Sequence, residues 1–392
     1  MNQNYKTTAY LLILISLGYF ATDIYLPSLP ALAVYFQASD NEVQMTLFFY
    51  MLSFSLAPIL FGPLSDHIGR KKVILIGVST GIAATIGCLI ASNIYGLIAA
   101  RFVQGIGCGA VMIASRATTS DLFTGKALAQ QISQVTMFMP LALALAPTIG
   151  GILQEEFQWQ AVFIFLIGYM LLILILASFR SESLKQPSNK KASQVFSTYL
   201  EHLTNRPFIL FGINFVLPSL GLFAYLTTSS FLFQEVIGLT PSEYGSLALY
   251  IGGVIMASSY LNSKLIHHYE VTTILFLGVG FILLAGCLLL FFHLMGILTT
   301  WSLLIPTLLY FTCLPFCISN SASKAMNFIH SHFGAATALM TTIQFLAGTV
   351  GSFIFSVISD KTALPLAICF ICVGLLSLLN LLIVRRQEKK AA

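Results

Sequence analysis

The sequence has 392 residues, of which 57% are hydrophobic and only 8% are charged, and its formal net charge is +5. Soluble domains carry about 25% charged residues, and a soluble protein of this length could not bury so much apolar surface. The composition therefore argues against soluble, secreted and nucleic-acid-binding proteins. It indicates that lipid surrounds most of the chain.

Twelve apolar runs are long enough to cross a membrane, which takes about 20 mostly apolar residues per helix. In the first half these runs cover residues 7–36, 44–64, 73–90, 95–117, 128–153 and 161–179. In the second half they cover residues 208–233, 244–266, 272–292, 301–320, 335–358 and 364–384. Pro27 and Pro30 are expected to kink or break the outer part of the first run.

One connection between the runs is longer and more polar than the others. It extends from Arg180 to Arg206 and separates six runs from six. The sequence therefore predicts an all-α polytopic membrane protein with twelve transmembrane helices. A six-helix bundle over residues 1–180, a cytoplasmic linker over 181–206 and a second six-helix bundle over 207–392 are expected.

Basic residues indicate the orientation, because Lys and Arg concentrate in the cytoplasmic loops of membrane proteins. With a cytoplasmic N-terminus, one of the 19 basic residues, Arg101, lies several positions inside a run from the outer side, and another, Lys361, lies on the opposite face. The other 17 fall at or near the cytoplasmic face: Lys6, Arg70, Lys71, Lys72, Arg116, Lys126, Arg180, Lys185, Lys190, Lys191, Arg206, Lys264, Lys324, Arg385, Arg386, Lys389 and Lys390. Both termini are predicted to be cytoplasmic, and this asymmetry explains the net charge without a nucleic-acid partner.

Asp23 is the only carboxylate well inside an apolar run, in the segment TDIYLPSLP. Ionisable residues inside a bilayer are costly and often belong to proton or substrate pathways. Asp23 is therefore a candidate proton carrier. Two other interpretations remain open at this point. Asp23 could form a permanent ion pair, or it could lie at the outer interface if the first helix ends at Pro27.

Arg101 begins the segment RFVQGIGCG, several positions inside its run. An arginine at that depth must face the protein interior and find acceptors. Asp23 is the candidate partner, and Gln104 lies one turn away on the same face. Alternatively, Arg101 only holds helices together. Gly105 and Gly109 have the spacing of small residues that lets helices approach closely.

The connection after the second run reads GPLSDHIGRKK and ends at Lys72. Asp66 is expected to favour a helix N-terminus, and Arg70 is expected to bind an acidic partner such as Asp121. Charge alone would also allow an ordinary cytoplasmic turn.

The fifth run contains ALAPTIGG, from Ala144 to Gly151. Pro147 removes a backbone hydrogen bond, while Gly150 and Gly151 remove side-chain bulk. These residues predict a bent and closely packed outer half-helix.

The layout and these segments together resemble the major facilitator superfamily. GPLSDHIGRKK is similar to the family's signature loop between spans two and three, with matches at Gly62, Leu64, Asp66, Gly69, Arg70 and Lys71. His67 stands where the family usually has Arg. RFVQGIGCG and ALAPTIGG resemble the fourth-span motif and the fifth-span motif of antiporters, with Ala146 in place of the usual Gly. TDIYLPSLP resembles the bicyclomycin and chloramphenicol-resistance branch of the drug:proton antiporters.

The resemblance implies two bundles around a central cavity that opens alternately to the two sides of a bacterial inner membrane. Asp23 would be the proton site and Arg101 its modulator. The residues that would gate the cytoplasmic side are Gly62, Asp66, Gly69, Arg70 and Asp121. The antiporter-type motif would consist of Pro147, Gly150 and Gly151. In the second half, residues 262–268 (NSKLIHH) form a degenerate counterpart of the signature loop.

Several side chains within the spans are candidates to line a substrate cavity, although packing is the commoner role for any one of them. They are Tyr19, Tyr50, Gln104, Met137, Asn214, Tyr225, Tyr310, Asn320 and Gln344. The second half has no central acidic residue, which favours neutral, zwitterionic or mildly amphipathic substrates over dications. An anion that uses Arg101 stays open.

The leading prediction is a proton-coupled antiporter that exports small organic molecules such as drugs, siderophores or metabolites. The alternative is a proton-coupled importer or facilitator with the same fold. The sequence has no metal-binding cluster, no Ser-His-Asp set and no nucleotide-binding loop. We therefore expect no enzymatic activity, no cofactor and no metal. The expected partners are a small-molecule substrate, protons and membrane lipid. The protein is expected to be a monomer.

Overall fold

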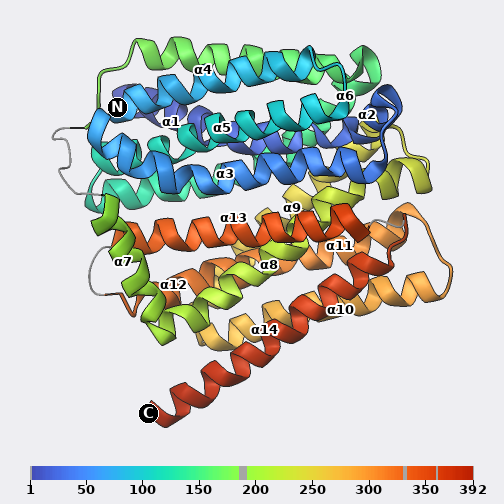
Figure 1. The fold of residues 1–392 in the computed structure, drawn as a ribbon. Helices are drawn as coiled ribbons and strands as arrows, with labels where there is room; N and C mark the ends of the chain where they lie inside the picture. Colours follow the sequence, from blue (N-terminus) through green and yellow to red (C-terminus); the bar gives the residue numbers. More distant parts are fainter. Residues whose placement is uncertain (1, 185–191, 330–332, 359–360, 392) are drawn as a thin grey trace. The chain divides into compact units, whose positions relative to one another are not determined.

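The computed structural model describes residues 2–184, 192–329, 333–358 and 361–391 (Figure 1). Throughout these ranges the regular structure is helical, without strands. The chain divides into two compact units. The first unit consists of Met1–Lys190 together with Leu239–Leu249, and the second of Lys191–Gly238 together with Tyr250–Ala392.

Six α-helices and one short 3₁₀ turn precede the connection at residue 180. They are α1 (Asn2–Asp23), the 3₁₀ turn Leu26–Ser28, α2 (Leu29–Phe36), α3 (Asp40–Ile68), α4 (Arg70–Leu89), α5 (Ile94–Leu122) and α6 (Gly125–Ser178). Helix α5 packs against both α3 and α4 (Figure 1). Glycines permit this approach, because a side chain at Gly105 or Gly109 would collide with the backbone of α3 at Tyr50 or Phe54. The predicted role of the two glycines in close helix packing is confirmed.

The first predicted span is interrupted, as Pro27 and Pro30 suggested. Helix α1 ends at Asp23, and the chain then passes through the 3₁₀ turn Leu26–Ser28 into α2. A proline lacks the amide hydrogen that an α-helix interior needs, so α1 does not continue through Pro27, whereas Pro30 lies in the first turn of α2, where no amide donor is needed. Asp23 therefore lies at the break itself.

The predicted fifth and sixth spans both lie in α6, which consists of two helices that meet at a kink. The kink is at Gln158, with φ 67° and ψ 172°, so the two spans are separate, as predicted, with a very short connection between them. Among the described residues, eleven helical elements are long and apolar enough to cross a membrane. Since α6 holds two predicted spans on either side of Gln158, the chain has twelve transmembrane segments.

The remaining helices lie within or after the connection that begins at residue 180. They are α7 (Ala192–Thr204), α8 (Arg206–Phe231), α9 (Pro241–Leu265), α10 (Val271–Leu294), α11 (Thr300–Leu314), α12 (Asn320–Met326), α13 (Phe333–Ile358) and α14 (Leu364–Ala391). The π-helical segment Leu232–Val236 continues α8. A second π-helical segment, Pro315–Ser319, joins α11 to α12. The connection predicted to be only a polar linker therefore contains a helix, α7.

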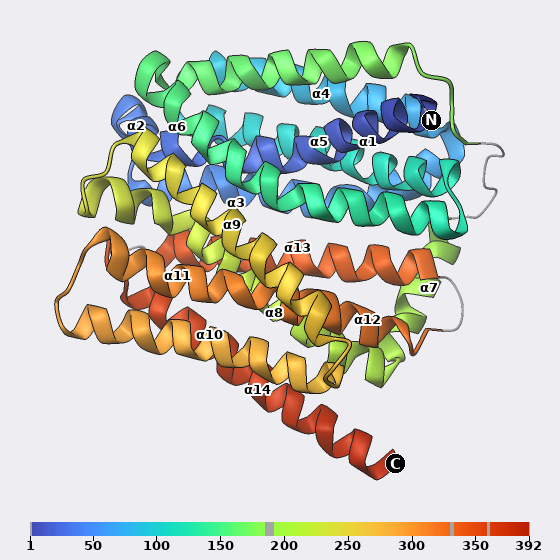
Figure 2. The same cartoon turned by 180° about the vertical axis from the view of Figure 1, so that it is seen from behind.

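Within the second unit, α8 packs against α13 and α14, and α10 packs against α11 and α14 (Figure 2). Helix α9 is shared, because its residues up to Leu249 group with the first unit and those from Tyr250 with the second.

Candidate functional site

A completely buried arginine lies at the centre of the first unit. The guanidinium carbon of Arg101, on α5, lies 4.4 Å from the ring centre of Tyr25 and 4.2 Å from that of Tyr50. Its Nη1 donates hydrogen bonds to the Ala21 carbonyl at 3.1 Å and to Gln104 Oε1 at 2.5 Å. A desolvated cation between two aromatic faces gains about 2 kcal/mol or more from each, which helps to offset the cost of burial.

The predicted contact between Asp23 and Arg101 is wrong, since none of the ion pairs within the described residues joins them. Asp23 is 2% exposed, and its Oδ2 atom has no hydrogen-bond partner in the described structure. Arg101 instead reaches the backbone carbonyl of Ala21, two residues before Asp23, without involving the Asp23 carboxylate. An unpaired carboxylate is costly to bury, which singles out Asp23 chemically.

Tyr19 lies one turn before Asp23 on α1. It lies near the charged side chains of both Asp23 and Arg116. Its ring also lines a small cavity with Phe138 and Met139 of α6. Tyr19 is therefore a predicted cavity residue that lies near Asp23.

A charge network forms at the junction of α3 and α4. Arg70 is the first residue of α4, and its Nε donates to Asp121 Oδ2 at 2.9 Å, so the predicted contact is present. Its Nη1 donates to Ser65 Oγ at 2.7 Å and to Asp66 Oδ1. The network joins α3, α4 and the end of α5.

Two expectations about this junction need correction. Asp66 lies in the last turn of α3, so it is not at a helix N-terminus; the carboxylate at the N-terminus of α4 belongs to Glu182. The signature segment is also almost entirely helical, because only Gly69, with φ +106°, interrupts it. Gly62 has no described atom within 4 Å of where its side chain would begin, so packing there does not require glycine.

The fifth-span motif packs closely inside the first unit. A side chain on Gly150 would collide with the carbonyl of Ile24, the residue after Asp23, and one on Gly151 with the carbonyl of Pro241. Thr148 Oγ1 donates to the Gly245 carbonyl at 3.0 Å. The motif thus holds α6 against both the break in α1 and the start of α9.

Polar residues predicted from the second unit take part in packing within that unit. Tyr310 is buried, donates to the Pro218 carbonyl at 2.8 Å and stacks on Phe370. Asn320 Nδ2 donates to Asn262 Oδ1 at 2.8 Å. Substrate contact by Tyr310 or Asn320 stays a prediction.

The other predicted cavity residues differ in exposure. Tyr225 is buried with its ring edge-on to Phe311, whereas Met137 is 71% exposed. Gln344 is half-buried. Asn214 is 1% exposed, and neither polar atom of its amide has a hydrogen-bond partner among the described residues. The buried amide of Asn214 therefore has hydrogen-bonding capacity that a ligand or water could use.

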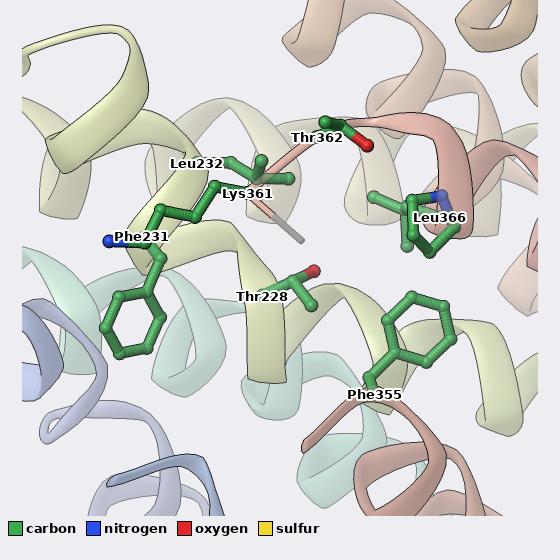
Figure 3. A pocket seen from close by; sticks show the side chains of 8 residues that line it. Thr228, Phe231, Leu232, Phe355, Lys361, Thr362 and Leu366 are labelled. Atoms are coloured by element: carbon green, nitrogen blue, oxygen red, sulfur yellow. The ribbon is translucent and has the colours of Figure 1, made fainter. Parts of the chain in front are cut away.

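A small apolar pocket lies near the end of α8 in the second unit (Figure 3). Phe231 of α8 and Phe355 of α13 contribute rings to its wall. Lys361 also lines it and forms an ion pair of 2.6 Å with Glu235. This pair joins the end of α8 to the segment before α14.

Sequence reasoning missed Tyr25, Ser65, Asn262 and Glu182 as members of these clusters. Tyr25 lies just after α1 ends, beyond the reach of helical spacing, so no local pattern predicts that its ring meets Arg101. Glu182 is an acidic residue on a face rich in basic ones, but nothing local indicates its partner.

No metal centre was expected. Across the parts of the chain that the structure describes, no group of three or more His, Cys, Asp and Glu side chains could hold a metal ion.

Residues 11–352 match the family profile of the Major Facilitator Superfamily. The chain belongs to this family of membrane transporters. It is 27% identical to the bicyclomycin resistance protein homolog of Haemophilus influenzae over 372 residues, or 93% of each chain. It is 25% identical to multidrug resistance protein D of Escherichia coli over 378 residues, which cover 96% of this chain and 95% of the relative. The resemblance to the bicyclomycin-resistance branch is confirmed.

Solved structures of other transporters share the fold. The xylose transporter XylE from E. coli, in a partially occluded inward open conformation, matches with a TM-score of 0.74 at 13% identity, over 97% of both chains. The POT family transporter PepTSo matches with a TM-score of 0.75 at 13% identity, over 97% of this chain and 99% of the other. The predicted twelve-helix major facilitator fold is confirmed.

Proposed function

We propose that this chain is a proton-coupled antiporter that exports small organic molecules. The observation that carries the proposal is Asp23, a buried carboxyl group with an unpartnered oxygen at a helix break. Ionisable groups in such places serve proton relays in membrane transporters. The names of the relatives, bicyclomycin resistance and multidrug resistance, favour export of drug-like compounds over import.

In this mechanism the bundles predicted over residues 1–180 and 207–392 expose the binding site alternately to the two sides. Asp23 takes up a proton from one side and releases it to the other. Arg101, on α5, modulates Asp23 indirectly, because it binds the carbonyl of Ala21, and Ala21 and Asp23 belong to the same helix, α1. Substrate and proton bind in turn to the state in which Asp23 is accessible, and each disfavours binding of the other. This competition couples their movements in opposite directions.

The network around Arg70 acts as the cytoplasmic gate. It joins three helix ends through ionic contacts that solvent can reach, because Asp66 and Asp121 side chains are 44% and 22% exposed. Such contacts can form and break at low cost, as a reversible latch requires.

The substrate is neutral, zwitterionic or mildly amphipathic. In the described part of the second unit no Asp or Glu is buried, so nothing there offers a second counter-charge for a dication. Asn214 supplies a buried amide with free hydrogen-bonding capacity in the same unit. Drugs, siderophores and metabolites of this chemistry are the expected cargo of a monomer in a bacterial inner membrane, with both termini in the cytoplasm.

The test is flux of radiolabelled chloramphenicol into inverted proteoliposomes under an imposed pH gradient, with proton release followed by pyranine fluorescence. Wild-type protein should accumulate label only with the gradient. Asp23→Asn should not. Glu156→Gln removes an exposed carboxylate instead and serves as the control, with wild-type flux expected. Gradient-driven accumulation by Asp23→Asn would refute the assignment of the proton to Asp23.

A further inference from the structure

Glu182 follows α6 in the segment that leads out of the first six spans. Its Oε1 atom accepts a hydrogen bond from the Arg70 amide at 2.9 Å, and Oε2 accepts one from the Lys71 amide at 3.1 Å. Oε1 also accepts from the amides of Ser183 and Leu184 at 2.9 and 3.0 Å. One carboxylate therefore binds four backbone N–H groups.

These contacts stabilise the start of α4. The first amides of a helix have no acceptor within the helix, and a negative charge there also interacts favourably with the helix dipole. Arg70 and Lys71 are the first two residues of α4. Glu182 supplies both the acceptor and the charge that the N-terminus lacks.

Gly69 makes this contact possible in two ways. Its φ of +106° is a conformation that residues with a side chain rarely adopt. A Cβ atom at Gly69 would also overlap the carboxylate of Glu182. Gly69, the single non-helical residue between α3 and α4, thus leaves the space that the Glu182 carboxylate occupies.

The same short segment touches the charge network from the other side. Ser183 Oγ donates to Asp121 Oδ2 at 3.5 Å, and Lys71 Nζ donates to the Ser178 carbonyl at 2.8 Å. Glu182 therefore holds the backbone of Arg70, while Asp121 binds its side chain and Ser183 contacts Asp121.

We propose that Glu182 is a positioning residue of the network, which holds the first turn of α4 so that Arg70 reaches Asp66 and Asp121. This rests on the proposed function of the network as a gate. Because Glu182 begins the connection between the two six-span halves, a displacement of that connection would loosen Arg70 and its partners together.

The test compares Glu182→Gln with the full-length wild type by hydrogen–deuterium exchange in proteoliposomes. Loss of a helix cap should speed exchange in the first turn of α4, residues 70–73, roughly fivefold to tenfold. A positioning role predicts a second effect, faster exchange in the last turn of α5, residues 119–122, which Arg70 holds through Asp121. Glu182→Asp should restore part of both.

Glu243→Gln is the matched control, because Glu243 is also an exposed carboxylate that accepts from a backbone amide, that of Thr240, at 2.8 Å. It should leave residues 70–73 and 119–122 unchanged. Faster exchange confined to α4 in Glu182→Gln would overturn the proposal and reduce Glu182 to a cap. Chloramphenicol flux is a separate readout: normal flux despite loosened α4 and α5 would refute the gate instead.

Discussion

The two units bury different polar chemistry. In the described chain, all buried Asp, Glu, Lys and Arg side chains belong to the first unit: Asp23, Arg70 and Arg101. The second unit buries amides, of which Asn214, Asn262 and Asn320 are examples. A buried charge responds strongly to protons and to new counter-charges, whereas an amide does not titrate. Asp23, the proton carrier of the proposed mechanism, therefore belongs to the first unit.

The helix ends near the signature segment and near its degenerate counterpart sharpen this comparison. In the first unit, Arg70 binds Asp66 and Asp121 across three helices. In the second, Asn262 and Asn320 join α9 to α12 by a single neutral hydrogen bond. Ionic contacts at a partly exposed site can be released by water and salt, but a buried amide pair stays in place. We expect the first junction to open during transport and the second to hold.

Replacing the buried acid of the first unit by an amide should have the largest effect. Asp23→Asn should lower gradient-driven chloramphenicol flux at least about 100-fold, because Asp23 is the only buried carboxylate among the residues that the structure describes. Binding should persist and lose its pH dependence, as measured by equilibrium binding from pH 6 to pH 8.5. Pronounced pH dependence in Asp23→Asn would place the titrating group elsewhere.

A conservative change of the buried cation should have the next largest effect. Arg101→Lys keeps the charge but loses the planar group that stacks between Tyr25 and Tyr50 and binds Gln104. Flux should fall about tenfold, which corresponds to about 1.4 kcal/mol. Arg180→Lys changes an arginine that lies over Tyr10 in the same unit, and should stay near wild type. Equal losses in both variants would mean that Arg101 has no special role.

Neutralising the charge network should reduce transport moderately. Asp121→Asn weakens a partly buried ion pair worth about 1 kcal/mol, so flux should fall about fivefold. Membrane insertion and chloramphenicol binding should remain close to wild type. The measurement is initial flux normalised to the amount of inserted protein, and an unchanged rate would reduce the segment to an ordinary turn.

The amide junction of the second unit should show the opposite pattern. Asn262→Ala leaves Asn320 Nδ2 without this acceptor in a buried place, which should lower stability by about 1–2 kcal/mol. Flux should change by less than about twofold, since the contact holds rather than switches. Thermal unfolding in detergent and the flux assay together separate the two effects. A large loss of flux at unchanged stability would erase the distinction between the junctions.

The sequence by itself determined the spans, the break in the first span and the segments that carry the chemistry. These features depend on local properties: the length of an apolar run, the missing amide hydrogen of Pro27, and the cost of placing Asp23 or Arg101 in lipid. Each can be evaluated within a short window of residues. The family fold and the gating residues were instead expected from the resemblance of these segments to the major facilitator superfamily.

Only the tertiary structure decided which groups meet. Arg101 lies between Tyr25 and Tyr50 and binds the Ala21 carbonyl and Gln104 instead of Asp23. Glu182 reaches the start of α4 across 112 positions of the sequence, where no local pattern announces it. Partner choice depends on how helices distant in sequence pack and rotate, and side chains of similar local character then acquire different roles.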